Sequence, residues 1–185
     1  KEFIRKVQPI YQDPFASFNP FYKIDRVLTY PLLKFNPSLS KNKYSDVISS
    51  ALDSVGLNPS DTLGRFPHQL SGGQRQRLML ARCLLCKPEI IIADEPVSMI
   101  DASLRTDILV QLKNLNQNHK ISILYITHDL TTAYNACDEL VVMKNGFAVE
   151  IGDCKSIIKT PENKYTQDLI RSIPTLDVSQ NWLDL

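Results

Sequence analysis

The feature that most constrains the fold is a continuous apolar run over 90–93 that ends directly in two carboxylates, Asp94 and Glu95. A run without polar alternation is typical of a strand buried on both faces, as in a parallel sheet. Because open parallel sheets present functional groups at the carboxyl ends of their strands, both carboxylates are candidate site residues. Asp94 is placed to hold Mg²⁺ beside nucleotide phosphates, and Glu95 to orient or deprotonate an attacking water. This pattern alone leaves open a solvated acidic turn.

The second half of the chain alternates between strand and helix patterns. Strands are expected at 121–127 and 139–143, and helices at 74–86 and 130–136. Asn145-Gly146 is a strong tight-turn signal, so 147–151 is expected to return as the second arm of a hairpin. The alternation predicts an α/β fold with a parallel sheet.

The first half is predicted to be less regular. Residues 3–11 are rich in branched and aromatic side chains and are expected to be extended. Prolines at 14, 20, 31 and 37 favour a loop over 13–40. An apolar stripe over 47–55 predicts a helix, with Gly56 placed to end it.

The charge balance excludes one class of partner. Lys and Arg total 21 against 20 for Asp and Glu, so the net charge is +1. A broad nucleic-acid-binding face needs a clear basic excess, so no nucleic-acid partner is expected. The sequence also lacks the run of about 18–20 apolar residues that would span a bilayer. Any membrane role is therefore expected to come through a partner.

The four cysteines do not form a metal-binding pattern. Cys83 and Cys86 have the C-x-x-C spacing, but a second ligand pair is missing and both fall in the expected helix 74–86. Free cysteine packs as a small hydrophobe. We expect both to be buried thiols rather than metal or redox groups.

A second candidate site precedes that helix, at Leu70-Ser71-Gly72-Gly73-Gln74. Two glycines let a backbone approach an anion closely, and the unpaired amides of a helix start bind phosphate. The Ser71 hydroxyl adds a donor. Taken alone, the motif favours a plain Ser-Gly-Gly turn with an N-cap.

The string LSGGQRQRLMLARCLLCKPEIIIADEP resembles the signature motif and Walker B strand of ABC ATPases. The resemblance implies an α/β core of the P-loop NTPase type, RecA-like, with a parallel sheet and a helical subdomain. It also implies that Ser71, Gly72, Gly73 and Gln74 contact the γ-phosphate of ATP held by the opposite subunit. Asp94 then resembles the magnesium-coordinating acid, and Glu95 the catalytic base.

Three other residues match positions of the same family. Asp101, at the end of Ser98-Met99-Ile100-Asp101, resembles the D-loop aspartate. His128 resembles the switch histidine that contacts the γ-phosphate. Gln12 resembles the Q-loop glutamine, which approaches metal and water. His68 and His119 have no such match and are expected to be structural.

Residues 11–20 and the tail from Thr160 to Pro174 resemble the ATPases of oligopeptide, dipeptide and nickel importers. The implied cofactors are ATP and Mg²⁺. The implied partners are transmembrane permease subunits, a second ATPase subunit that is identical or different, and, indirectly, an extracytoplasmic solute-binding protein. The implied location is peripheral, on the cytoplasmic side of the cell membrane. Phe15 and Phe18 are expected to matter for coupling to the permease.

The family's phosphate-binding pattern, GxxxxGK[ST], is not found at any of the six glycines. We therefore expect an incomplete core, truncated before the Q-loop, that does not hydrolyse ATP by itself. The expected domains are a core strand with Q-loop (1–12), a helical subdomain ending in the signature (13–73), the C-terminal half of the core (74–155) and an extension (156–185). The strand at 121–127 should then have a vacant edge, closed by the hairpin 139–151 or by a second molecule.

Two other functions stay open at this point. One is a soluble ABC ATPase that acts outside transport. The other is a non-catalytic module that uses the fold to pair with a complete ATPase.

Overall fold

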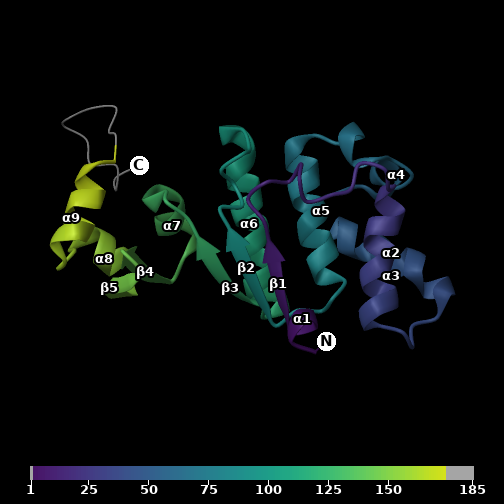
Figure 1. Cartoon of the computed structure of the whole chain (residues 1–185), viewed down its shortest axis with the longest axis horizontal. Coiled ribbons are helices and arrows are strands. Elements are labelled where there is room, and N and C mark those ends of the chain that lie inside the picture. The colour runs from purple at the N-terminus through teal and green to yellow at the C-terminus, as the bar shows by residue number, and fades with distance from the viewer. Residues whose placement is uncertain (1, 174–185) are drawn as a thin grey trace. The chain divides into compact units, whose positions relative to one another are not determined.

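The computed structural model describes residues 2–173, with the side chains of 102 and 103 left out (Figure 1). The chain divides into two compact units, 1–126 and 127–185. Each unit is described by itself.

The first unit is built on a three-stranded parallel sheet. Its strands are β1 (Val7–Ile10), β2 (Ile90–Asp94) and β3 (Ser122–Ile126), in the order β1-β2-β3. In the register, Gln8 lies beside Ile91, and Ile91 beside Ile123. The α/β class and the parallel sheet predicted from the apolar runs are confirmed.

Helices pack on this sheet and form a lobe next to it. The described helices of this unit are α1 (Glu2–Lys6), α2 (Ile24–Phe35), α3 (Tyr44–Asp53), α4 (Pro59–Thr62), α5 (Gly72–Leu84) and α6 (Ala102–His119). Two short 3₁₀ turns, Lys41–Lys43 and Pro67–Gln69, join them. Figure 1 shows α5 between the sheet and the lobe formed by α2, α3 and α4. The core passes through α5, where Leu78 and Met79 are fully buried.

The loop expected over 13–40 is wrong for its central part, because α2 occupies Ile24–Phe35. Ile24, Leu28 and Leu32 recur every four residues and are buried, so one face of the helix joins the core. Pro31 lies inside the helix and is buried as well. An interior proline costs about 3 kcal/mol, and burying three large aliphatic side chains at about 1.5–3 kcal/mol each outweighs that cost.

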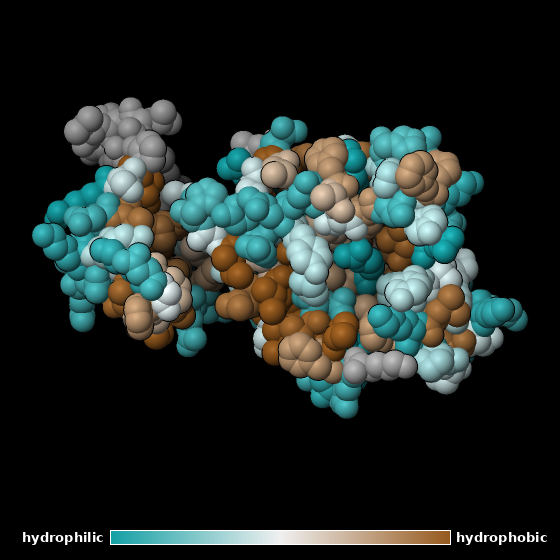
Figure 2. Space-filling model, in the orientation of Figure 1, coloured by the Kyte–Doolittle hydropathy of each residue, from teal (hydrophilic) through white to brown (hydrophobic). Residues whose placement is uncertain are grey.

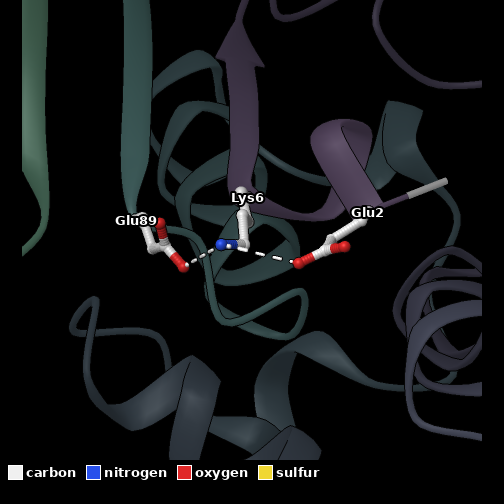
Figure 3. Close-up of polar contacts among 3 residues, drawn as sticks. All are labelled: Glu2, Lys6 and Glu89. Atoms are coloured by element: carbon white, nitrogen blue, oxygen red, sulfur yellow. Dashed lines mark ion pairs between the residues drawn. The ribbon is translucent and has the colours of Figure 1, made fainter.

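The extended segment expected over 3–11 is also wrong in part, since residues 2–6 form α1 and only Val7–Ile10 form β1. Lys6 links this helix to the residue before β2 (Figure 3). Its Nζ lies 3.0 Å from Glu89 Oε1 and 3.6 Å from Glu2 Oε1. The hydrogen bond and charge of Glu89, followed by the charge of Glu2, raise the pKa of Lys6. The Lys6–Glu2 pair is spaced to favour a short helix at the N-terminal side of the strand.

The second unit contains an antiparallel hairpin with three helices. Its described elements are α7 (Leu130–Ala136), β4 (Glu139–Lys144), β5 (Phe147–Asp153), α8 (Cys154–Lys159) and α9 (Lys164–Arg171). Asn145 and Gly146 have φ values of 50° and 83°, which a type I′ turn requires at both central positions. The predicted hairpin is confirmed.

Among residues 2–173, β3 pairs with β2 alone, and β4 pairs with β5 in a separate sheet. The two arms of the hairpin pair with each other across the tight turn. The expectation that the hairpin or a second molecule closes the edge of β3 stays a prediction. On one face of the sheet Ile90, Leu124 and Ile126 are 40%, 56% and 44% exposed. Figure 2 shows apolar residues gathered over this sheet.

We predict that the 185-residue chain self-associates through β3, because an open apolar strand edge invites pairing with another chain. Sedimentation velocity over a concentration series should show oligomers, and Leu124→Lys should shift the population toward monomer. Leu33→Lys is the matched control, because Leu33 is similarly exposed but lies on α2. A monodisperse monomer at high concentration would contradict the prediction.

Candidate active site

The two predicted carboxylates lie at the carboxyl end of the central strand, as the sequence indicated. Asp94 is the last residue of β2 and is exposed. Glu95 follows with a φ of 43°, a left-handed conformation that is uncommon for a side chain of this kind. Two contacts hold this turn: Glu95 N–H donates to the Ile126 carbonyl at 2.9 Å, and the Glu95 carbonyl accepts from Ser98 Oγ at 3.0 Å. Such backbone strain is concentrated at functional sites.

Gln12 lies beside Glu95. Its Nε2 donates to Glu95 Oε2 at 2.7 Å, although 83 positions separate the two residues. The sheet brings them together, since Gln12 follows β1 closely and Glu95 follows β2, and these strands are neighbours. Two of the residues predicted for the catalytic site are thus in direct contact.

The donor set at this edge fits magnesium better than a transition metal. Carboxylate and amide oxygens of Asp94 and Gln12 are ligands that Mg²⁺ prefers. The described residues contain no group of three or more His, Cys, Asp or Glu able to hold a metal. A few protein oxygens suffice for Mg²⁺, which keeps several waters and binds substrate phosphates.

The Leu70–Gln74 motif opens α5, and its polar side chains cap that helix. Ser71 Oγ accepts from Gln74 N–H at 3.2 Å, and Gln74 Oε1 accepts from Ser71 N–H at 2.9 Å. This capping box confirms the structural reading of the motif. The two readings are compatible, because anion binding at a helix start uses backbone amides of the first turn.

Gly73 is buried at this first turn, close to another helix. A Cβ at Gly73 would lie 2.9 Å from Leu104 Cδ1, on α6. Its lack of a side chain therefore permits the close approach of α6.

Asp101 and His128, the two other predicted site residues, both lie next to the start of a helix. Asp101 is the N-cap residue of α6 and is exposed; its carbonyl accepts from Leu104 N–H at 2.9 Å. His128 is exposed and belongs to the second unit, in the turn between β3 and α7. The next residue, Asp129, caps α7 by accepting from Thr131 N–H at 2.9 Å.

Two phenylalanines after Gln12 stack with arginines of α5, which the sequence reasoning missed. The Arg75 guanidinium carbon lies 3.7 Å from the Phe15 ring centroid, and that of Arg82 lies 5.4 Å from the Phe18 centroid. Phe18 is only 5% exposed and packs in the core, and its expected effect on coupling stays a prediction. Arg75 and Arg82 are spaced by two helical turns, which places both on one face of the predicted helix. This spacing was the sequence signal that could have predicted the two contacts.

The two thiols of the C-x-x-C pair are buried, as expected. Cys83 donates to the Pro9 carbonyl at 3.8 Å, and Cys86 to the Arg82 carbonyl at 3.7 Å. Burial raises the pKa of Cys83 to about 12 and that of Cys86 to about 11. Neutral thiols of this kind are poor nucleophiles and poor metal ligands.

We predict that Cys83 and Cys86 resist a disulfide reagent in the native chain and react rapidly once it is unfolded. An unfolded thiol has a pKa of about 8.5, so it ionises where the folded thiol stays protonated. Because the folded pKa is the higher one, their contribution to stability is complete below about pH 8.5 and is lost as the pH rises toward the folded value. Labelling followed by peptide mass spectrometry, with guanidinium as the control, measures this. Rapid native labelling of both thiols would contradict it.

Solved structures of ABC ATPase domains have this fold. The ATP-binding cassette MJ0796, in a dimeric post-hydrolysis state bound to ADP and Pi, matches with a TM-score of 0.70 and 25% identity, over 83% of this chain and 66% of that chain. CbiO1 from Clostridium perfringens, part of the ABC transporter complex cbiONQ, matches with a TM-score of 0.75 and 24% identity, over 87% of this chain and 62% of that chain. The fold is thus that of an ABC ATPase domain, of the P-loop NTPase class.

The sequence profile of the ABC transporter family matches residues 1–98, and the chain belongs to that family. A second profile, the oligopeptide/dipeptide transporter C-terminal region, matches residues 149–185.

Relatives in peptide transport systems match along most of the chain. The oligopeptide transport ATP-binding protein OppF of Streptococcus pyogenes serotype M1 is 38% identical over 176 residues, which are 95% of this chain and 57% of that protein. The dipeptide transport ATP-binding protein DppF of Escherichia coli K12 is 40% identical over 173 residues, 94% of this chain and 51% of that protein. The chain spans about half the length of these relatives. Over its described residues, no helix has the length and apolarity to cross a bilayer.

Proposed function

We propose that this chain acts in the ATP-hydrolysing subunit of an ABC importer for peptides or similar solutes. The observation that carries the hydrolytic part is the Gln12–Glu95 hydrogen bond beside Asp94, at the carboxyl edge of the sheet. The match of residues 149–185 to the oligopeptide/dipeptide transporter region supports the solute class.

In this proposal the residues at the edge of the sheet share the work. Asp94 and the amide oxygen of Gln12 would hold Mg²⁺, which neutralises charge on the phosphates of ATP. Glu95 accepts a proton from the attacking water, and Gln12 fixes the direction of its carboxylate through the 2.7 Å hydrogen bond. His128 contacts the γ-phosphate.

The first turn of α5 has a different task. Ser71, Gly72, Gly73 and Gln74 meet the γ-phosphate of ATP bound to a second ATPase subunit, with Asp101 at the same interface. The positive end of the helix dipole favours that anion. Since the 185 residues contain no GxxxxGK[ST] loop, we expect the chain alone not to hydrolyse ATP.

The proposed partners follow from a transport role. They are the transmembrane permease subunits, a second ATPase subunit that is identical or different, and indirectly an extracytoplasmic solute-binding protein. The subunit would then lie peripherally on the cytoplasmic side of the cell membrane. The names of the OppF and DppF relatives support this assignment.

The test is reconstitution of the complete ATPase that carries this sequence with its candidate permeases in proteoliposomes. We expect ATP-dependent peptide uptake that is lost with Glu95→Gln. ATP hydrolysis without uptake or permease stimulation would favour a soluble ATPase acting outside transport. Hydrolysis that does not depend on Glu95 would favour a non-catalytic module paired with another ATPase.

A further inference from the structure

The segment from Gln12 to Phe18 connects the Glu95 carboxylate to the first turns of α5. At one end, Gln12 donates to Glu95 at 2.7 Å. Three residues on, the Phe15 ring lies under the Arg75 guanidinium, with 3.7 Å between its central carbon and the ring centroid. We call the Phe15–Arg75 pair the clasp.

The short segment between these contacts is held by its own hydrogen bonds. Asp13 Oδ1 accepts from the backbone N–H groups of Phe15 at 2.6 Å and Ala16 at 3.1 Å. The Asp13 carbonyl accepts from Ser17 Oγ at 2.6 Å. Such an Asx turn limits the backbone freedom of a loop. These bonds hold Phe15 in a fixed position relative to Asp13, the residue next to Gln12.

The arginine contributes to the clasp through its flat face rather than through hydrogen bonds at Nε. Arg75 Nε is buried, with no hydrogen-bond partner among the described residues. Burial lowers the pKa of Arg75, and the nearby Asp13 carboxylate opposes that shift. A partly desolvated guanidinium over an aromatic face makes a stronger cation–π contact than a solvated one.

The clasp also contacts the first turn of α5, which carries the Leu70–Gln74 motif. Arg75 lies on α5 one position after Gln74, and a Cβ built on Gly72 would lie 3.9 Å from the Phe15 ring. The ring thus packs against the backbone that opens α5. A shift of this turn would move Arg75 and Phe15 together.

We propose that the Phe15–Arg75 clasp is a positioning device that holds the Gln12 amide at the Glu95 carboxylate and ties this contact to the first turn of α5. Phe15 and Arg75 are positioning residues, because neither side chain contacts Glu95 or Gln12 in the described contacts. The proposal rests on the proposed ATP hydrolysis at Glu95. A ligand that binds the first turn of α5 would therefore favour one position of the Gln12 amide. By thermodynamic linkage, fixing the Gln12 amide would favour binding of that ligand equally.

The test uses Phe15→Leu in the complete ATPase, with steady-state hydrolysis measured over a range of ATP concentrations. Loss of one cation–π contact is expected to lower kcat about fivefold, with KM for ATP nearly unchanged. Phe15→Tyr keeps an aromatic face and should restore wild-type kcat. Phe21→Leu is the matched control, because Phe21 is 84% exposed and lies in the same loop between β1 and α2 but outside the Gln12–Phe18 segment.

A double-mutant cycle decides whether Phe15 acts through Gln12. In a Gln12→Ala background, Phe15→Leu should cause no further loss of kcat, because the group that it positions is gone. If the two losses multiply instead, the clasp does not act through Gln12 and the proposal is overturned. An unchanged kcat for Phe15→Leu would overturn it equally.

A second readout separates this proposal from the proposed function. Hydrogen exchange of the Phe15 and Ala16 amides, which donate to Asp13, should speed up in Phe15→Leu but not in Phe21→Leu. If the wild type shows no Glu95-dependent hydrolysis, the proposed function fails while the exchange result still reports on the clasp. Unchanged exchange in Phe15→Leu would show that the ring does not order the loop, and would overturn the clasp.

Discussion

Glu95→Gln is expected to lower the turnover number of the complete ATPase by about 10²–10⁴-fold, because an amide cannot accept the proton of the attacking water. Glutamine has nearly the same shape, and its amide can still meet Gln12. We therefore expect nucleotide binding to persist, and the ATP-bound dimer to live longer. Phosphate release under saturating Mg-ATP measures turnover, and fluorescent nucleotide titration measures binding.

Glu89→Gln is the matched control for this experiment. Glu89 is an exposed glutamate just before β2, whereas Glu95 comes just after it, so the two lie at opposite ends of one strand. Its ion pair with Lys6 is exposed, and such pairs contribute little to stability. Turnover close to wild type in Glu89→Gln is expected. Similar turnover in Glu95→Gln would remove Glu95 from the role of base.

Leu28→Ala is expected to destabilise the chain by about 2–5 kcal/mol, because it leaves a cavity in a closed core. Leu28 is fully buried on α2. Denaturant unfolding followed by circular dichroism measures the loss in the free energy of unfolding.

Leu33→Ala is the matched control, being the same substitution on the same helix. Leu33 is 51% exposed, and surface changes usually alter stability by about 0.5 kcal/mol or less. Equal losses at the two positions would mean that α2 does not bury the face assigned to it.

The sequence predicted the strands and the hairpin because their signals are local. The run 90–93 and the Asn145-Gly146 turn each specify one conformation, and both were confirmed. It missed α2 because Pro31 is a local signal against helix, whereas the favourable term is burial of Leu28 and Leu32 in a core that only the folded chain contains.

The candidate site also has features that the sequence predicted from local signals and features that depend on the folded chain. Asp94 and Glu95 were placed correctly, since a strand end is a local property. The contact between Gln12 and Glu95 depends on β1 and β2 being neighbours, which strand patterns alone do not specify. The Phe15–Arg75 stack was missed for the same reason, as it joins distant segments.

The close approach at Gly73 has a consequence for how this protein can vary. A Cβ at 73 would lie 2.9 Å from Leu104 Cδ1, so a larger residue at 73 requires the end of the Leu104 side chain to shift. A smaller residue at 104 would remove the need for that shift. The effect of a substitution at 73 on stability therefore depends on which residue is at 104, and the reverse also holds.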